Sequence, residues 1–407
     1  DFIKKNRRQP FFLYLPYNTP HSPMQVPDRF WEKFQEKELH QIGSNGPPKN
    51  QNQIDHTRAA LAMCENIDWN VGRIIDQLKN SGVLENTIVI YLSDNGPNGN
   101  RWNGLMKGRK GSTDEGGVRS PMIINWPGKI PQGKIVKEIA SGIDLLPTLK
   151  DLTGITSQAK KPLDGISLEP LIMQENPIWE DRYIYNYWKG KLSLRNQHYR
   201  LDHQGQLFDM VNDPNQTKDI GEKKPQVLTA LNKAKEQWEQ VVLVELPKKD
   251  NRPFYIGHPS LHTTQVPARD GIPSGEIKRS NRYPNCTYFT HWINPEDTIT
   301  WEAEVAQDGD FEITVYYSCA EDAIGSLFEV SFGDASIQGE IKEVHNPNEY
   351  GAAEDRVLRQ ESYVKDFKPL KIGTLKLKKG KGTLKIKGIE KKGRALMDFR
   401  LMLLKLI

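Results

Sequence analysis

Continuous apolar runs in the first third of the chain have the pattern of β-strands. Residues 10–15 read PFFLYL and residues 87–92 read TIVIYL, each almost without a polar position. Such runs are typical of strands covered on both faces, so residues 10–15 predict a buried strand and residues 87–92 a central parallel one. Residues 121–126, which read PMIINW, predict a further strand that ends at Pro127 and Gly128.

Apolar side chains at helical spacing lie between and after these runs. Positions 67, 71, 74, 75 and 78 form one stripe, which predicts a helix over residues 55–82 that stops at Gly82. The same reasoning predicts helices over residues 144–152 and 225–242. A helix followed by a buried strand indicates a βαβ arrangement and so the α/β class.

The pattern changes after about residue 180. Short alternating segments over residues 182–209 predict a small antiparallel sheet. The polar, proline-containing stretch 247–253 interrupts the periodicity and is the predicted linker.

Beyond the linker the chain has an all-β pattern. Segments 298–305 and 311–316 alternate on either side of an Asp-Gly-Asp turn, and segments 375–377 and 384–387 flank a Gly-Lys turn. Each pair predicts a hairpin, the second with one basic face. Short strands at this spacing predict a β-sandwich.

Composition narrows the class of partner. The 407 residues carry 56 Lys and Arg against 52 Asp and Glu, a net charge of +4, which argues against a dedicated nucleic-acid binder. No apolar run approaches the roughly 20 residues that span a bilayer, so no transmembrane segment is expected. Cys64, Cys286 and Cys319 are too widely spaced to predict a metal cluster or a disulfide framework.

Two loops carry candidate chemistry. Asp94 and Asn95 directly follow the 87–92 strand, where open α/β sheets place their ligands. A carboxylate beside a carboxamide suits a hard divalent cation, although an Asx-type turn explains the same pair. Lys107, Arg109 and Lys110 alternate with glycines, a pattern that lets a backbone approach a tetrahedral oxyanion, and the alternative is a solvated basic loop.

A histidine lies on a third loop. His21 follows the predicted strand 10–15 within a proline-rich stretch, which forbids regular structure and stiffens the loop. The side chain is a candidate general acid or a hydrogen-bond donor to an anion, and the alternative is an ordinary loop residue.

The order of these features resembles the formylglycine-dependent sulfatases, which are arylsulfatase-like members of the alkaline phosphatase superfamily. The chain is similar to that family in several motifs that follow one another in the family's order. They are Pro20-His21-Ser22-Pro23, Ser93-Asp94-Asn95-Gly96, Lys107-Gly108-Arg109-Lys110-Gly111, Glu115-Gly116-Gly117-Val118-Arg119-Ser120-Pro121, Trp126-Pro127-Gly128, Asp144-Leu145-Leu146-Pro147-Thr148, Asp164-Gly165-Ile166-Ser167-Leu168 and Leu207-Phe208-Asp209-Met210-Val211-Asn212-Asp213-Pro214. The resemblance runs from about residue 10 to residue 242.

The resemblance implies a fold and a division into domains. The expected fold is α/β, with an alkaline-phosphatase-like sheet flanked by helices, a small antiparallel C-terminal subdomain and an appended β-sandwich. The expected domains are a partial sulfatase catalytic domain over residues 1–178, the small subdomain with its helix over residues 179–246, and the accessory β-sandwich over residues 254–407.

The resemblance also implies an activity and roles for individual residues. The expected reaction is hydrolysis of sulfuric esters, with an aryl or, more in keeping with the accessory domain, a carbohydrate sulfate as substrate, in the periplasm or outside the cell. Asp94 and Asn95 are then metal ligands for calcium, or for magnesium. Lys110 contacts the sulfate, and His21 contacts it near the leaving oxygen.

One part of the family pattern is missing. The family's nucleophile is a formylglycine made from Cys or Ser in a C/S-x-P-x-R motif, and no such motif occurs among these residues. The chain is therefore expected to be N-terminally truncated, to contain no nucleophile and to be inactive alone.

Two alternatives to a sulfatase stay open. One is a phosphodiester or phosphonate hydrolase of the same superfamily. The other is a non-catalytic pseudoenzyme or glycan-binding protein. In the accessory domain, Trp292, Trp301, Tyr316 and Tyr317 are candidates for a sugar-stacking surface, and core packing is the alternative.

Overall fold

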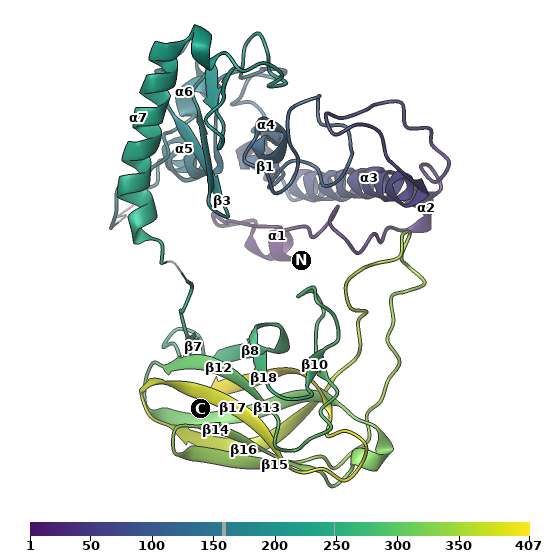
Figure 1. Ribbon diagram of the computed structural model, residues 1–407. Helices are drawn as coiled ribbons and strands as arrows, with labels where there is room; N and C mark the ends of the chain where they lie inside the picture. Colours follow the sequence, from purple (N-terminus) through teal and green to yellow (C-terminus); the bar gives the residue numbers. More distant parts are fainter. Residues whose placement is uncertain (157–159, 248) are drawn as a thin grey trace. The chain divides into compact units, whose positions relative to one another are not determined.

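The computed structural model describes residues 1–156, 160–247 and 249–407 (Figure 1). The chain forms two compact units. The first contains Asp1–His21 and Val26–Pro247, and the second contains Ser22–Gln25 and Lys248–Ile407. Residues 157–159 of the predicted catalytic domain and Lys248 of the predicted linker lie outside the described residues. The three-part division into 1–178, 179–246 and 254–407 stays a prediction.

The long helix α3 (Gln51–Asn80) runs through the first unit. It begins where the Asn50 side chain accepts a hydrogen bond from the backbone N–H of Gln53 at 3.0 Å, and it ends before Gly82, whose φ of 69° is left-handed. The helix predicted over residues 55–82 is therefore confirmed. The remaining α-helices of this unit are α1 (Phe2–Asn6), α2 (Asp28–Trp31), α4 (Glu115–Val118), α5 (Leu145–Thr153), α6 (Glu169–Met173) and α7 (Pro225–Val242). Short 3₁₀ turns occur at Leu84–Asn86, Gly142–Asp144, Gly221–Lys223, Leu243–Glu245, Ala268–Asp270 and Glu321–Ala323.

Two of the predicted strands form, but with different neighbours. Strands β1 (Val89–Leu92) and β2 (Met122–Asn125) pair with each other antiparallel in a two-stranded sheet, so the prediction of a central parallel strand is wrong. A two-stranded ribbon has no strand on either side and covers neither face fully, so Ile123 is 60% exposed. Apolar content reports a preference for burial, but it does not select the neighbouring strand.

The strand predicted over residues 10–15 does not form. These residues are irregular, and the side chains of Phe12 and Tyr14 are 78% and 74% exposed. None of the described strands pairs with this apolar run. Pro10 and Pro16, which cannot donate a backbone hydrogen bond to a ladder, bound it.

The small antiparallel sheet is confirmed. Its strand order is β3 (Ile184–Trp188), β4 (Lys191–Arg195), β5 (Tyr199–Leu201) and β6 (Leu207–Asp209). Lys189 and Gly190, with φ of 47° and 80°, make the two-residue turn that matches the twist of the first hairpin. Helix α7 packs on this sheet through Leu231 and through Trp238, whose ring stacks on that of Tyr185 at 5.1 Å.

The second unit contains two six-stranded sheets (Figure 1). One has the order β15-β14-β17-β12-β7 with β9 on β12, and the other has the order β10-β11-β18-β13-β16 with β8 on β18. The strands are β7 (Phe254–Ile256), β8 (Thr263–Pro267), β9 (Ile272–Pro273), β10 (Lys278–Arg279), β11 (Phe289–Thr290), β12 (Thr298–Val305), β13 (Gly309–Ser318), β14 (Leu327–Phe332), β15 (Ala335–Glu340), β16 (Lys368–Leu377), β17 (Gly380–Glu390) and β18 (Asp398–Leu406). Inward side chains of both sheets, such as Trp301 and Phe311, share one hydrophobic core.

Both predicted hairpins of this unit are wrong. Strands β12 and β13 belong to different sheets, and so do β16 and β17. Strand β12 pairs instead with β17, from Thr298 opposite Lys387 to Val305 opposite Gly380. A connection that crosses from one sheet to the other produces the same alternation of apolar and polar positions as a hairpin does, because both strands face one core.

The core also corrects the proposed sugar-stacking surface. Trp292, Trp301 and Tyr317 are each 1% exposed and belong to the shared core. The Trp301 indole N–H donates to the carbonyl oxygen of Pro267 at 3.1 Å. These three rings are closed to a ligand, and only Tyr316 of the four is partly accessible.

Candidate functional site

The loop after β1 is attached to the glycine-rich loop that precedes β2. The backbone N–H of Gly96 donates to the carbonyl oxygen of Gly117 at 2.9 Å. A Cβ on Gly96 would lie 1.9 Å from the carbonyl oxygen of Gly116, so the approach requires a glycine. The Ser120 hydroxyl donates to the carbonyl oxygen of Ser93 at 2.7 Å. Segments more than 20 residues apart in sequence therefore form one surface.

Lys110 belongs to the same surface as Asp94 and Asn95. Its backbone N–H donates to the carbonyl oxygen of Pro97 at 3.0 Å, and its side chain is exposed. Gly108 and Gly111, with φ of 89° and 85°, turn the chain on either side of it. The structure thus brings the loops of two predicted site elements together.

Asp94 and Asn95 supply the oxygen donors that a hard cation prefers. The Asn95 amide donates to the Asp94 carboxylate, so the two side chains point to one place. One carboxylate and one carboxamide fit part of a calcium shell, which takes six to eight oxygens. Among residues 1–156, 160–247 and 249–407, no three His, Cys, Asp or Glu side chains are grouped as a metal site. The metal site stays a prediction.

Lys107 differs from Lys110 in having buried partners. Its ammonium lies 2.8 Å from the carboxylate of Asp202 and 3.6 Å from that of Asp114. Asp202 follows strand β5 and is buried. Lys107 therefore neutralises two carboxylates, whereas the side chains of Arg109 and Lys110 in the same loop are exposed.

Sequence reasoning missed a buried ion-pair network beneath the glycine-rich loop. Glu115 is 2% exposed, and its carboxylate lies 2.5 Å from Arg195 and 3.0 Å from Arg200. Burial lowers the pKa of both guanidinium groups, and Glu115 opposes that effect. The Glu115 backbone N–H donates to the Gln216 side chain at 3.0 Å. The signal in the sequence that could have revealed this network is the presence of arginines on the otherwise apolar strands β4 and β5.

His21 lies on the proline-rich loop as predicted. Its side chain is exposed, and its backbone N–H donates to the carbonyl oxygen of Asn18 at 3.1 Å. The division into units falls between His21 and Ser22. The meeting of His21 with Asp94 and Lys110 stays a prediction.

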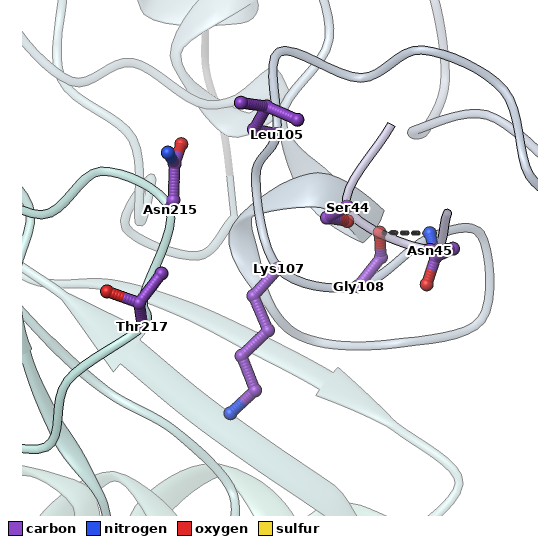
Figure 2. Close-up of a pocket in the computed structure, with 7 residues that line it drawn as sticks. All are labelled: Ser44, Asn45, Leu105, Lys107, Gly108, Asn215 and Thr217. Carbon is purple, nitrogen blue, oxygen red and sulfur yellow. Dashed lines mark hydrogen bonds between the residues drawn. The ribbon is translucent and has the colours of Figure 1, made fainter. Parts of the chain in front are cut away.

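A cavity of about 430 Å³ borders the glycine-rich loop (Figure 2). Asn215 and Thr217 lie on one side of it, with Leu105 and Lys107 opposite. Asn45, another lining residue, donates its side-chain amide to the carbonyl oxygen of Gly108 at 3.3 Å. Ser44 completes the lining. Most of its lining residues have polar side chains, and one of them, Gly108, lies two residues from Lys110 in sequence.

Two family models match overlapping parts of the first unit, which contains this surface. Residues 1–155 match the model described as Sulfatase, and residues 110–242 match the model described as N-sulphoglucosamine sulphohydrolase, C-terminal. Residues 1–242 belong to the sulfatase family. The glycine-rich loop lies where the two matches overlap.

Curated sulfatases are similar over the same region. The chain is 31% identical to the steryl-sulfatase of Rattus norvegicus over 203 residues, which are 47% of this chain and 32% of that protein. It is 33% identical to the uncharacterized sulfatase YdeN of Escherichia coli (strain K12) over 231 residues, 54% of this chain and 38% of that one. The chain thus spans about a third of the length of these relatives.

A solved structure is similar to this chain as well. The crystal structure of Ps i-CgsB aligns with a TM-score of 0.50 and 31% identity, covering 58% of this chain and 52% of that one. The same values hold for its complex with k-i-k-neocarrahexaose. The predicted family and the predicted α/β fold of the sulfatases are confirmed. None of the described helices combines the length and apolarity of a membrane span.

Proposed function

We propose that the protein hydrolyses sulfuric esters and that its substrate is a sulfated carbohydrate. The observation that carries the proposal is the attachment of the Asp94–Asn95 loop to the loop of Lys110, through Gly96 to Gly117 and Lys110 to Pro97. Two oxygen ligands for a cation and an exposed ammonium lie on one surface. Positive charge from both sources suits a sulfate group, whose oxygens carry the negative charge. Membership of the sulfatase family supports the same reaction.

In this proposal Lys110 and His21 have distinct roles. The Lys110 ammonium attracts the sulfate and balances the charge on its non-bridging oxygens as the ester bond breaks. His21, when protonated, donates to the bridging oxygen, which gains charge as it leaves. That donation matters most for a sugar alcohol, because an alkoxide is a poor leaving group.

A divalent cation would be held by Asp94 and Asn95 in this proposal. Calcium is favoured, with magnesium as the alternative, because the donors are oxygens of mixed charge. When bound, the ion supplies positive charge close to the sulfate. The carboxylate of Asp94 positions it, and the neutral Asn95 amide adds an oxygen without further negative charge.

The choice of a carbohydrate rests on a relative. Ps i-CgsB, which is 31% identical, has been solved with k-i-k-neocarrahexaose bound. N-acetylgalactosamine-6-sulfatase of Canis lupus familiaris is 32% identical over 198 residues, which are 33% of that protein. The bound hexaose of the first relative and the name of the second both refer to sugars, and the side chains of Asn45, Asn215 and Thr217 at the cavity can hydrogen-bond to sugar hydroxyl groups.

The test compares sulfate with phosphate esters in the enzyme expressed from its complete reading frame. Inorganic sulfate released from sulfated carrageenan oligosaccharides and from 4-nitrophenyl sulfate is measured by ion chromatography. Turnover of bis(4-nitrophenyl) phosphate and of a phenyl phosphonate ester is measured in parallel, because these are the substrates of the alternative hydrolase. We expect a higher kcat/KM for the sulfates. A higher value for the phosphodiester would replace the proposal with the phosphodiesterase alternative, and binding of oligosaccharide without turnover would favour the pseudoenzyme.

A further inference from the structure

A single buried side chain fastens together two of the loops that line the cavity of Figure 2. Asn103 is 4% exposed, and its side-chain oxygen accepts a hydrogen bond from the backbone N–H of Ser44 at 3.1 Å. Its amide nitrogen donates to the carbonyl oxygen of Gly108 at 3.0 Å. A Cβ on Gly43 would lie 2.2 Å from the carbonyl oxygen of Arg101, so the two loops are in backbone contact.

The opposite wall of the cavity is anchored to the same glycine-rich loop. The side-chain oxygen of Gln216 accepts a hydrogen bond from the backbone N–H of Glu115 at 3.0 Å. The backbone N–H and the hydroxyl of Thr217 donate to the carboxylate of Asp213 at 2.7 and 3.0 Å. All the lining residues belong to the first unit. Both walls are therefore held in place before a ligand arrives, which lowers the entropic cost of binding.

Each wall also holds one residue in a left-handed backbone conformation that favours glycine. The φ angle is 61° at Leu105 and 55° at Gln216. This conformation costs free energy in a residue with a Cβ, and such positions gather at functional sites. The Leu105 side chain lines the cavity and is 49% exposed, so the fold gains little in return from burying it.

The positive charge at this cavity is already compensated. Among the described residues that line it, only Lys107 is charged, and its ammonium lies 2.8 Å from Asp202 and 3.6 Å from Asp114. The buried guanidinium of Arg200, which also interacts with both carboxylates, is shared with Glu115 at 3.0 Å. A sulfate placed in the cavity would lose hydration without gaining an ammonium of its own, and it would approach two carboxylates.

The neutral part of the lining suits a sugar ring. Asn45, Asn215 and Thr217 carry uncharged donors and acceptors, and Leu105 adds apolar surface opposite Asn215 (Figure 2). A sugar presents both kinds of surface, because hydroxyl groups surround the ring and C–H groups cover its faces. The cavity volume of about 430 Å³ lies within the range of small-molecule sites.

The cavity also lies close to the candidate sulfate-binding cation. Gly108 lines it and precedes Lys110 by two residues, so their Cα atoms are at most about 7.6 Å apart, the length of two Cα–Cα steps. A sulfate at the Lys110 ammonium and a ring in the cavity are therefore within reach of one oligosaccharide.

We propose that the cavity is a subsite for an uncharged sugar unit that neighbours the sulfated unit of the substrate. This inference rests on the proposed function, in which Lys110 contacts the sulfate of a sulfated carbohydrate. The three neutral polar side chains bind hydroxyl groups of the neighbouring unit, and Leu105 packs on its ring. A second sulfate on that unit is disfavoured, because the ammonium of Lys107 is already held by two carboxylates.

The test compares substrates with and without a second sugar unit in the enzyme expressed from its complete reading frame. Sulfate release is measured for 4-nitrophenyl sulfate, κ-neocarratetraose and ι-neocarratetraose, the last two differing only in a sulfate on the anhydrogalactose units. Asn215→Ala removes a polar contact. Leu105→Gly removes the apolar contact and puts glycine at a left-handed position, so this variant is expected to fold. Asn80→Ala, exposed at the end of α3, is the matched control, and circular dichroism melts verify folding.

The expected result is a loss of preference for the tetrasaccharide. The wild type has a kcat/KM for the κ tetrasaccharide at least about tenfold above that for the ι form. Asn215→Ala lowers the ratio of kcat/KM for the κ tetrasaccharide to that for 4-nitrophenyl sulfate about 3- to 10-fold, the scale of one lost hydrogen bond. Leu105→Gly lowers the same ratio without lowering the melting temperature. Asn80→Ala leaves the ratio unchanged.

The contrary outcomes separate the subsite from the proposed reaction. Folded Asn215 and Leu105 variants that keep the wild-type ratio overturn the subsite, and so does a wild type that prefers the ι form. A wild type that cleaves 4-nitrophenyl sulfate and neither tetrasaccharide also overturns it, while hydrolysis of sulfuric esters stands. Sulfate release from none of the three esters overturns the proposed function and the subsite with it.

Discussion

The backbone N–H of Lys110 and the carbonyl oxygen of Pro97 are joined by a hydrogen bond of 3.0 Å. Pro97 lies two residues after Asn95, so this bond fixes the loop of the candidate metal ligands against the loop of the candidate sulfate-binding cation. The side chain of Lys110 takes no part in the bond and stays exposed. Removing the ammonium should therefore leave the loops attached.

Replacing Lys110 by alanine should lower kcat/KM by about 10²- to 10³-fold in the enzyme expressed from its complete reading frame, because an ammonium aimed at developing charge is lost. The melting temperature should not change. Steady-state sulfate release and a thermal melt measure the two quantities, with Lys79→Ala, exposed on α3, as the control. Near-wild-type turnover would remove Lys110 from the site.

Replacing Asp94 by asparagine should weaken calcium binding at least tenfold, since the only carboxylate of the proposed pair is lost. Isothermal titration calorimetry on the chelator-treated enzyme reports binding independently of turnover. Asp151→Asn, exposed on α5, is the matched control. Equal calcium affinity in the Asp94 variant and the wild type would place the ion elsewhere.

Replacing Glu115 by glutamine should destabilise the first unit by about 3–5 kcal/mol, because Arg195 and Arg200 would be left as buried charges without their shared partner. Urea unfolding followed by circular dichroism gives the difference. Glu222→Gln, on an exposed turn, should change the free energy of unfolding by less than about 0.5 kcal/mol. A similarly small change for Glu115→Gln would mean that the network contributes no net stability.

Asp209 should give stability that disappears in acid. The Asn212 side-chain amide at 2.9 Å, and the backbone N–H groups of Asn212 and Val211, lower the pKa of its carboxyl. A lowered folded pKa means that the contribution is present above the unfolded value of 3.8 and is lost as pH falls through the folded pKa. Asn212→Ala should thus cost more stability at pH 6 than at pH 3. An equal cost at both would exclude the linkage.

Replacing Trp301 by alanine should cost about 3–5 kcal/mol, the usual scale for a large core side chain. Trp188→Ala, at an exposed position of β3, is the control and should cost far less.

Affinity electrophoresis in carrageenan should show the same retardation for a folded Trp301→Phe variant as for wild type. A loss of retardation in that variant would restore the sugar-stacking interpretation.

Local periodicity predicted what is decided locally. The stripe that includes Ile67 and Leu78 predicted a helix, and Gly82 marked its end because a left-handed φ favours glycine. Partners across the sheet were not predicted. Val89–Leu92 has the apolar run of a central strand, yet among the described residues its ladder is with Met122–Asn125, because an apolar run favours pairing without specifying the strand it pairs with.

The candidate site divides in the same way. Motifs placed Asp94, Asn95 and Lys110 on loops that the structure attaches to each other. The Glu115 network and the hydrogen bond from Gln25 to Asp355 depend on pairs separated by 80 or more residues, and no local pattern encodes such pairs. Only the inward position of charged residues on apolar strands hinted at them.

The crossing of successive strands between the two sheets has a consequence for synthesis. Because β12 pairs with β17, and β13 with β16 and β18, most of the long ladders join strands that are distant in sequence, with the β14–β15 hairpin as the exception, and β18 is an interior member of its sheet. The C-terminal unit must assemble after translation has passed residue 406, through slow non-local pairing. Ser22–Gln25, which precede the rest of this unit in the chain, must wait for it. A nascent chain stalled before β18 should remain protease-sensitive both in the C-terminal unit and at Ser22–Gln25.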